Sequence, residues 1–261
     1  MRRRVFIAGL ACIVVSLPLR TRAQHAEQVR RIGVLLPFAS DDPEAISRVT
    51  AFKNARQDLG WTVGKNLHID YGWAGRDAER FPSLAAEMVG LSPDVIVANG
   101  SDAMRALQQS TRTLPIVFLA VVDPVGAGYV ASLGRPEGNA TGVTLFEYSI
   151  AGKWLELLKQ IAPRVTRAAV LRDARLASGI GQFATIQTAA QSFGLEVDPI
   201  DVRDPSEIER SLAVFARGSD LGLLVTTSAL AVTTGKSFAS HQICPLSEGQ
   251  KACRERVNGT R

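Results

Sequence analysis

Two stretches of the chain share one hydrophobic pattern, and the same succession of elements follows each. Continuous apolar runs occur at residues 30–40 (RRIGVLLPFAS) and 166–176 (TRAAVLRDARL), and such runs are typical of strands buried in a parallel sheet. A helical stretch follows each run and closes with a glycine suited to the position just after a helix, Gly60 in the first half and Gly194 in the second. Both halves therefore begin with the same strand–helix unit.

The repeat extends through the next elements. Short strands are predicted at residues 67–71 and 199–204. Residues 81–101 (FPSLAAEMVGLSPDVIVANGS) then parallel residues 208–228 (IERSLAVFARGSDLGLLVTTS), with a helix, a polar turn, a strand and a small hydroxyl residue in each. This alternation predicts two doubly wound α/β lobes, each with a parallel sheet. The alternative is one α/β domain whose βα units merely look alike.

We place the first lobe at residues 28–145 and the second at residues 146–232. In open parallel sheets, ligands bind beyond the carboxyl ends of the strands. Two such lobes that face each other leave a cleft between these ends. The predicted fold class is therefore α/β, with two doubly wound parallel-sheet lobes and an interlobe cleft.

Polar side chains gather at the predicted strand ends in both halves. Hydroxyl and amide groups suit a carboxylate at a helix N-terminus, and the carboxylate of Asp123 suits an ammonium group. Each residue could instead be a plain N-cap, because N-caps use the same residue types; the coincidence of several strand ends favours a site. The groups are Ser40 to Asp42, Asn99 to Asp102 and Asp123 in the first half, and Arg172-Asp173 and Thr226 to Ser228 in the second. The candidate ligand contacts are Phe38, Ser40, Asn99, Ser101, Asp123, Thr144 and Thr227.

The N-terminus predicts export. Residues 1–23 are predicted to be a secretory signal peptide, because three arginines are followed by an uncharged run and by the small residues Thr21 and Ala23. Export could follow the Sec or the twin-arginine route. A membrane anchor is the alternative. This segment holds five of the 30 basic residues and no acidic one, so the mature chain carries 25 basic and 25 acidic side chains. A balanced charge gives no reason to expect nucleic acid as a partner.

The cysteines exclude thiol chemistry from the predicted lobes. Cys12 lies in the signal peptide, and Cys244 and Cys253 lie near the C-terminus. The latter two could form a disulfide in an oxidising compartment or have no role. His241 lies close to them, but three residues at irregular spacing make a poor metal site, so we expect none.

A glycine motif raises the question of a dinucleotide. Gly126-x-Gly128-x-x-Ala131 follows the apolar run of residues 115–122. Asp123-Pro124 separates the glycines from the strand, and the stretch that follows is too short for the usual crossover helix. We therefore expect no nucleotide cofactor.

The chain resembles the solute-binding proteins of a bacterial ABC uptake family, the tryptophan/tyrosine-type binding proteins. The resemblance rests on RRIGVLLP, LGWTVGKNLHIDYGWAGRD, PDVIVANGS, PIVFLAVVDPVGAGYVASLGRPEGNATGVT and WLELLKQIAPRVTRAAVL, and covers residues 1 to about 232. It implies a type I periplasmic-binding-protein fold and delivery of a small solute to a membrane permease. It also implies aromatic or branched amino acids as ligands, and a loop with a short helix at the glycine motif.

The pattern stops at Thr233, and the chain then resembles a truncated or frameshifted copy; a natural compact tail is the alternative. Residues 233–261 show no helical or strand period, and Cys244-Pro245 is typical of a loop or disorder. We expect the second lobe to be incomplete, with three strands and an unpaired edge. We expect it to be held loosely and to bind solute weakly or not at all.

Two other functions remain open from the residues. An exported α/β enzyme would need an acid or base in the cleft, where Asp41 or Asp173 could serve, because His25 and His68 are the only histidines before Thr233 in the mature chain. A sensory ligand-binding domain is the third possibility, and it would need a signalling module. We favour transport binding without catalysis.

Overall fold

The computed structural model describes residues 29–75, 77–201, 210–211, 214–215, 220–228 and 243–245. The predicted signal peptide, His241 and Cys253 lie outside these residues. The strands are β1 (Arg30–Leu36), β2 (Leu67–Trp73), β3 (Val95–Asn99), β4 (Ile116–Val121), β5 (Ala140–Thr144), β6 (Arg167–Arg172), β7 (Glu196–Asp201), β8 (Leu221–Val225) and β9 (Ile243–Pro245). The helices are α1 (Pro43–Asp58), α2 (Phe81–Gly90), α3 (Ser101–Ser110), α4 (Ile150–Ile161) and α5 (Ala177–Ala190), with short 3₁₀ turns η1 (Ala78–Arg80) and η2 (Gln191–Phe193).

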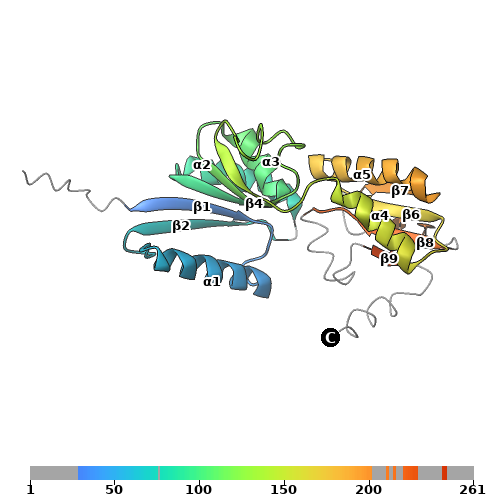
Figure 1. The fold of residues 1–261 in the computed structure, drawn as a ribbon. Coiled ribbons are helices and arrows are strands. Elements are labelled where there is room, and N and C mark those ends of the chain that lie inside the picture. The colour runs from blue at the N-terminus through green and yellow to red at the C-terminus, as the bar shows by residue number, and fades with distance from the viewer. Residues whose placement is uncertain are drawn as a thin grey trace, which may run out of the picture.

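The first sheet contains five parallel strands in the order β2-β1-β3-β4-β5. Helix α1 covers one face, and α2 and α3 cover the other (Figure 1). Alternate residues of β1 face opposite sides: Val34 and Leu36 pack toward α1, and Leu35 packs toward α2 and α3. Because both faces are covered, the strand is apolar throughout, which explains the continuous run in the sequence.

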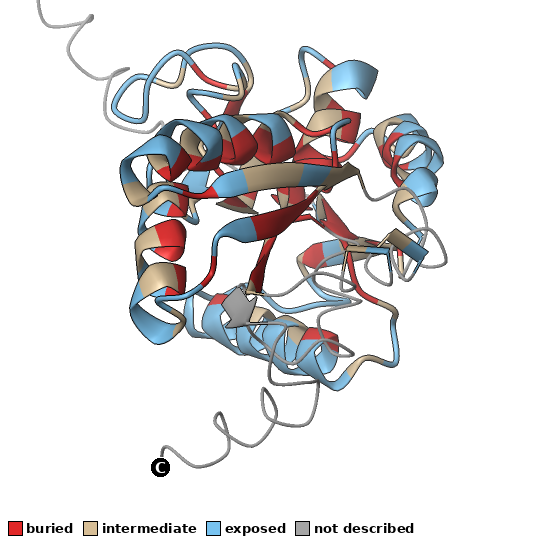
Figure 2. Cartoon of the chain, turned by 90° about the vertical axis from the view of Figure 1, so that its right-hand side faces the viewer, coloured by how far each residue is buried: buried red, intermediate tan, exposed pale blue. Residues whose placement is uncertain are grey.

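The second sheet is smaller. Strands β7, β6 and β8 are parallel, and β9 pairs antiparallel with β8. Helices α4 and α5 bury Leu155, Leu158 and Ile186 against one face of the sheet. Figure 2 shows buried residues concentrated along the strands and on the inner sides of the helices. The prediction of two parallel α/β units is confirmed.

Two details of the predicted second lobe are wrong. Its sheet does not end at β8, and Cys244-Pro245 lies in strand β9 rather than in a loop. Without β9, the outer edge of β8 would present a row of unpaired backbone N–H and C=O groups, and β9 pairs with that edge. Such backbone pairing leaves little trace in a hydrophobic pattern, so the sequence did not reveal it.

The glycines predicted to follow the helices do so. Gly60, just after α1, has φ +84°, and Gly194, just after η2, has φ +60° in the left-handed region. A side chain at either position would be strained, which is why glycine ends these helical stretches.

The packing of α4 generates a first prediction. Leu158 is fully buried against the second sheet, whereas its neighbour Leu157 is 47% exposed. Leu158→Ala leaves a cavity and is expected to lower the free energy of unfolding by about 2–5 kcal/mol, and Leu157→Ala by less than about 1 kcal/mol. Urea unfolding followed by circular dichroism measures both. Equal losses in the two variants would contradict the assigned packing of α4.

Candidate functional site

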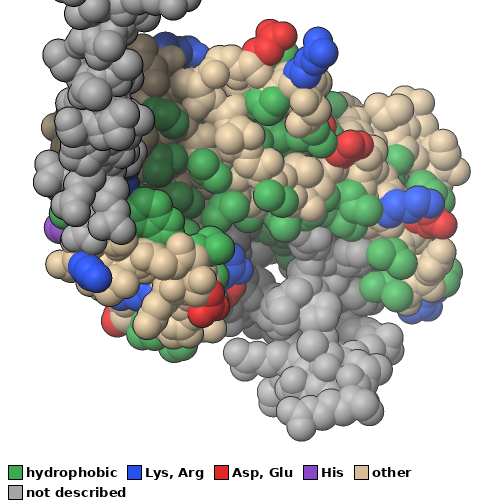
Figure 3. All heavy atoms as spheres, turned by 60° about the vertical axis from the view of Figure 1, so that its left-hand side comes forward, with side chains coloured by type: hydrophobic (Ala, Val, Ile, Leu, Met, Phe, Trp, Pro, Cys, Tyr) green, Lys and Arg blue, Asp and Glu red, His purple; other side chains and the backbone are tan. Residues whose placement is uncertain are grey.

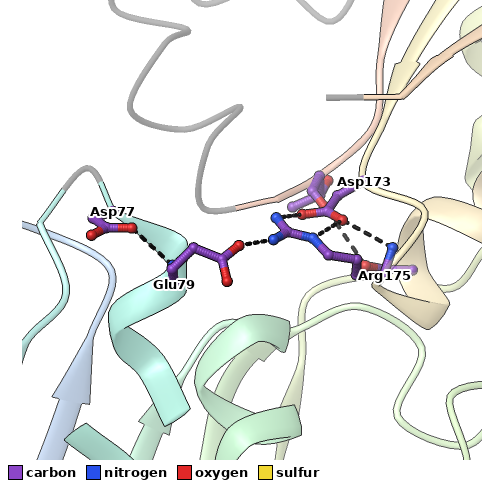
Figure 4. Close-up of polar contacts among 6 residues, drawn as sticks. Asp77, Glu79, Asp173 and Arg175 are labelled. Atoms are coloured by element: carbon purple, nitrogen blue, oxygen red, sulfur yellow. Dashed lines mark hydrogen bonds and ion pairs between the residues drawn. The ribbon is translucent and has the colours of Figure 1, made fainter. Parts of the chain in front are cut away.

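The carboxyl ends of strands from the two sheets meet at an ion pair. Glu79 lies in η1, after β2 of the first sheet, and Arg175 lies in the turn after β6 of the second. The Arg175 guanidinium pairs with the Glu79 carboxylate across the lobes (Figure 4). This contact places the two predicted ligand-binding edges opposite each other.

Asp173 fixes the position of Arg175. Its side chain is only 2% exposed, and its Oδ1 accepts from the backbone N–H and the Nε of Arg175, both at 2.9 Å. Oδ2 accepts from Nη2 at 2.7 Å. These bonds raise the pKa of Arg175 above its ordinary value, with the Asp173 hydrogen bond as the main cause. The guanidinium therefore stays charged and is held rigidly toward the first lobe.

Asp123 organises the end of β4, where it follows the strand in a left-handed conformation with φ +40°. Its carboxylate accepts from the backbone N–H of Gly126 at 2.7 Å and from that of Tyr148 at 3.3 Å. Its own N–H donates to the Phe146 carbonyl at 2.9 Å. Asp123 thus ties the loop after β4 to the segment that leaves the first lobe.

The glycine motif serves the packing of Tyr148. A Cβ added to Gly126 would lie 2.8 Å from Tyr148 Cε2 and 2.8 Å from Asp123 Oδ2. A Cβ on Gly181, in α5, would lie 2.3 Å from the same ring carbon. The ring therefore lies against one glycine from each lobe. The short helix that the resemblance implies at the motif is absent: residues 124–128 form turns.

Three candidate contacts converge on the end of β4. The Ser101 hydroxyl accepts from the Val122 N–H at 3.2 Å, and the Thr144 hydroxyl donates to the Val121 carbonyl at 3.1 Å. With Asp123 they surround residues 121–123. The capping interpretation fails for Ser101, because Gly100 is the N-cap of α3 and α3 has no side-chain cap. It holds for Asp42, which accepts from the Glu44 N–H at 2.9 Å at the start of α1.

The other first-lobe candidates are less closely grouped. Phe38 is 3% exposed and belongs to the core beneath α1, with the Arg48 guanidinium 5.2 Å from its ring centroid. Ser40 is exposed in the turn after β1, and Asn99 is half-buried at the end of β3. The structure therefore makes Phe38 a packing residue.

Thr227, after β8, is the candidate from the second lobe. Its backbone N–H donates to Gln182 Oε1 at 3.0 Å, and Gln182 in α5 is fully buried. Neighbouring Thr226 donates its hydroxyl to the Leu171 carbonyl at 3.0 Å. Within the described part of the chain, Thr227 Oγ1 and Gln182 Nε2 are buried without a hydrogen-bond partner.

Sequence reasoning missed Glu79, Arg175, Tyr148 and Gln182. Gln182 occupies a buried helical position where an apolar residue is expected, and nothing in its neighbours marks it. A signal for Tyr148 existed: an aromatic residue at the predicted lobe junction, next to the turn of Asp123. The Glu79–Arg175 contact joins positions 96 residues apart and has no local signal.

The described surface is mixed in character. Hydrophobic side chains gather across the middle of the face in Figure 3, and basic and acidic side chains lie mostly toward its borders. Among the described helices, none combines the length and apolarity of a membrane span. The described residues also contain no group of three or more His, Cys, Asp or Glu side chains that could hold a metal ion.

The family model for "ABC transporter substrate binding protein" matches residues 32–236, which include both sheets up to β8. The chain belongs to the ABC transporter substrate-binding protein family. Its parallel α/β sheets and the facing strand ends agree with this membership. The alternative of an exported enzyme gains no support.

Relatives of this substrate-binding protein come from several bacteria. A "Tyrosine-binding protein" of Clostridioides difficile (strain R20291) is 30% identical over 183 residues, which are 70% of this chain and 52% of the relative. The chain thus spans about half the length of the curated relative it matches. A crystal structure of an ABC domain in complex with L-Trp from Streptococcus pneumoniae is 25% identical, with a TM-score of 0.68 over 82% of this chain and 70% of that one. A conserved domain protein from Vibrio cholerae, 24% identical, shares the fold with the same TM-score, over 88% of this chain and 72% of that one.

Burial of the tyrosines predicts how this binding protein titrates. The chain has three tyrosines, and burial is the main cause that raises the pKa of each: Tyr129 and Tyr148 to about 12, and Tyr71 in the same direction. Folding therefore favours the neutral phenols. The contribution of the buried neutral tyrosines to the free energy of unfolding is complete below pH 10, the ordinary tyrosine pKa of the unfolded chain. This contribution is lost as the pH rises toward 12, the pKa of Tyr129 and Tyr148 in the folded chain.

Tyrosinate absorbance measures this directly. The folded chain is expected to show no tyrosine ionising near 10, and the unfolded chain is expected to show all three there. Tyr148→Phe removes one of the late transitions. A native tyrosine that ionises at its ordinary pKa would contradict the burial described.

The fit of Tyr148 against Gly126 gives a further prediction. Gly126→Ala forces the ring or the Asp123 carboxylate to move, and is expected to cost about 1–3 kcal/mol of stability. Gly134→Ala is the control, because nothing lies within 4 Å of the added carbon there. Chemical unfolding compares the variants, and a neutral Gly126→Ala would show that the ring is not held at this place.

Proposed function

We propose that this chain is the solute-binding component of an ABC uptake system and binds an amino acid or a similar small zwitterion without catalysis. The observation that carries the proposal is the meeting of polar groups from both lobes at the carboxyl ends of their strands, at Glu79 and Arg175 and around Asp123 and Tyr148. The amino acids named for the relatives, tyrosine and L-Trp, support the same ligand class.

Asp123 is the proposed partner of the ligand ammonium. Each carboxylate oxygen accepts one backbone N–H and retains capacity for another donor. The side chain is half-buried, so an ammonium bound there is only partly screened by water. Ser101 and Thr144 use their hydroxyls on the backbone of residues 121–122 and act by shaping this end of β4.

The remaining candidates are Ser40, Asn99 and Thr227, which we propose for the carboxylate or another polar group of the solute. Phe38 is left out of the proposed contacts, because it packs in the core of the first lobe. We further propose lobes at residues 28–145 and 146–232, export directed by residues 1–23, a periplasmic location, and delivery of the solute to an ABC permease in the inner membrane. No nucleic acid, metal or cofactor is part of this proposal.

An amino-acid panel tests the function. Calorimetric titration of the mature chain with the twenty amino acids is expected to find binding, strongest for aromatic or branched side chains. This replaces the weak or absent binding expected from the sequence pattern, because β9 covers the edge of β8 that was expected to be unpaired. Asp123→Asn keeps the size of the side chain and removes the charge, so it is expected to weaken binding by at least about tenfold.

Asp58→Asn is the matched control, because Asp58 is an exposed residue at the end of α1. Its affinity is expected to equal that of the unchanged chain. If no amino acid binds, the proposed ligand class is wrong. If Asp123→Asn binds as tightly as the control, Asp123 is not the ammonium partner.

A further inference from the structure

Three buried hydrogen-bonding atoms at one end of the second lobe have no partner. They are Tyr148 Oη, Gln182 Nε2 and Thr227 Oγ1, which make no hydrogen bond among the residues that the structure describes. A buried donor or acceptor without a partner lowers the stability of a protein. Such an atom in a native structure therefore needs an explanation, and a ligand that completes the hydrogen bond is one. All three can donate a hydrogen bond.

The three atoms belong to one neighbourhood. Gln182 Oε1 accepts from the Thr227 N–H at 3.0 Å, so the Gln182 amide and the Thr227 side chain lie side by side. Tyr148 Cζ, which carries the hydroxyl, lies 2.7 Å from the position of a Cβ on Gly181, the residue before Gln182. The three side chains therefore lie at the same turn of α5, with the Tyr148 ring at Gly181 and Thr227 at Gln182.

The orientation of the Gln182 amide is determined by its partner. The Thr227 backbone N–H can only donate, so the atom facing it must be the oxygen. The amide nitrogen then points elsewhere, and rotating the amide would place two donors together. Gln182 Nε2 is therefore an unpaired donor in a fully buried side chain.

Tyr148 also remains a donor at every ordinary pH. Burial, and next the negative charge of Asp123, raise the pKa of its hydroxyl to about 12. The carboxylate of Asp123 also accepts from the Tyr148 backbone N–H at 3.3 Å. A negative group and a set of neutral donors thus occur next to each other at the lobe junction.

We infer that Tyr148, Gln182 and Thr227 together bind the carboxylate of the amino-acid solute whose ammonium Asp123 holds. This inference rests on the proposed function and assigns the second lobe's share of the site. A carboxylate is acceptor-only and has about four lone-pair positions, so it satisfies three donors at once. Because the three atoms are buried in the structure, the inference requires that an opening of the two lobes makes them accessible to the solute.

Four substitutions test the inference. Tyr148→Phe and Gln182→Met each remove an unpaired donor and keep the approximate size of the side chain. Gln182→Met also removes the acceptor of the Thr227 N–H, so its readout is the difference between L-tyrosine and tyramine binding. Gln187→Met makes the same change on the exposed side of α5. Tyr71→Phe removes another buried hydroxyl that has no partner in the described region, but one that packs in the core beneath α1.

The probes are L-tyrosine, tyramine, which lacks the carboxylate, and 4-hydroxyphenylacetate, which lacks the ammonium. Tyr148→Phe and Gln182→Met are expected to weaken L-tyrosine binding at least tenfold and to change tyramine binding less than twofold. Tyr148→Phe is also expected to leave the urea midpoint of the solute-free chain unchanged or raised, whereas Gln182→Met lowers it because the Thr227 N–H loses its acceptor. The two control variants are expected to bind L-tyrosine as the unchanged chain does.

Each other result is decisive. A lower urea midpoint for Tyr148→Phe would show that the tyrosine hydroxyl already has a partner in the free protein, and would overturn the inference. Unchanged L-tyrosine affinity, or equal loss for tyramine, would overturn it while leaving the proposed function intact. If the unchanged chain binds no amino acid, the proposed function fails; the carboxylate site then stands only if 4-hydroxyphenylacetate raises the melting temperature of the unchanged chain and not that of Tyr148→Phe.

Discussion

The carboxylate of Asp123 is the constraint on which the junction between the lobes depends. It holds the Gly126 and Tyr148 backbones at once, from a residue whose own φ of +40° is unfavourable for a side chain. Charge-assisted bonds to two N–H groups offset that strain. The loop that they close leaves room for the Tyr148 ring only because positions 126 and 181 carry no Cβ. The placement of the crossing segment, and of α5 against it, follows from this arrangement.

The ion pair between Glu79 and Arg175 is the more visible contact between the lobes but the weaker one. The Glu79 side chain is 73% exposed, and exposed pairs contribute about 0–1 kcal/mol. The ion pair contributes mainly to the relative orientation of the lobes, because the buried Asp173 holds the Arg175 side chain in one orientation. Packing of Tyr148 joins the lobes, and the ion pair aligns them.

The junction also carries donors that have no partner among the described residues, which a purely structural interface would avoid. An apolar residue at position 182 would remove the unsatisfied amide nitrogen, but it would also take away the oxygen that accepts from the Thr227 N–H. A solute-binding protein accepts such a cost where its ligand completes the bonds. The hydroxyls of Ser101 and Thr144, in contrast, already form hydrogen bonds with the backbone at the end of β4.

The sequence by itself determined the class of fold and the sheet edges where the candidate site residues lie. Buried parallel strands must be apolar on both faces, and polar residues must follow where each strand ends, so both features are local and readable, as at β1 and Asp123. Only the tertiary structure decided which of those polar residues meet. In the structure, Phe38 lies in the core and the Ser101 hydroxyl has a backbone partner. Strand β9 joins the second sheet, and Tyr148 and Gln182 lie at the junction. Strand and helix patterns can be read from the sequence because they repeat with the geometry of the backbone. The contacts named above depend on side-chain packing and backbone pairing between segments far apart in the chain, and such contacts have no periodic pattern in the sequence.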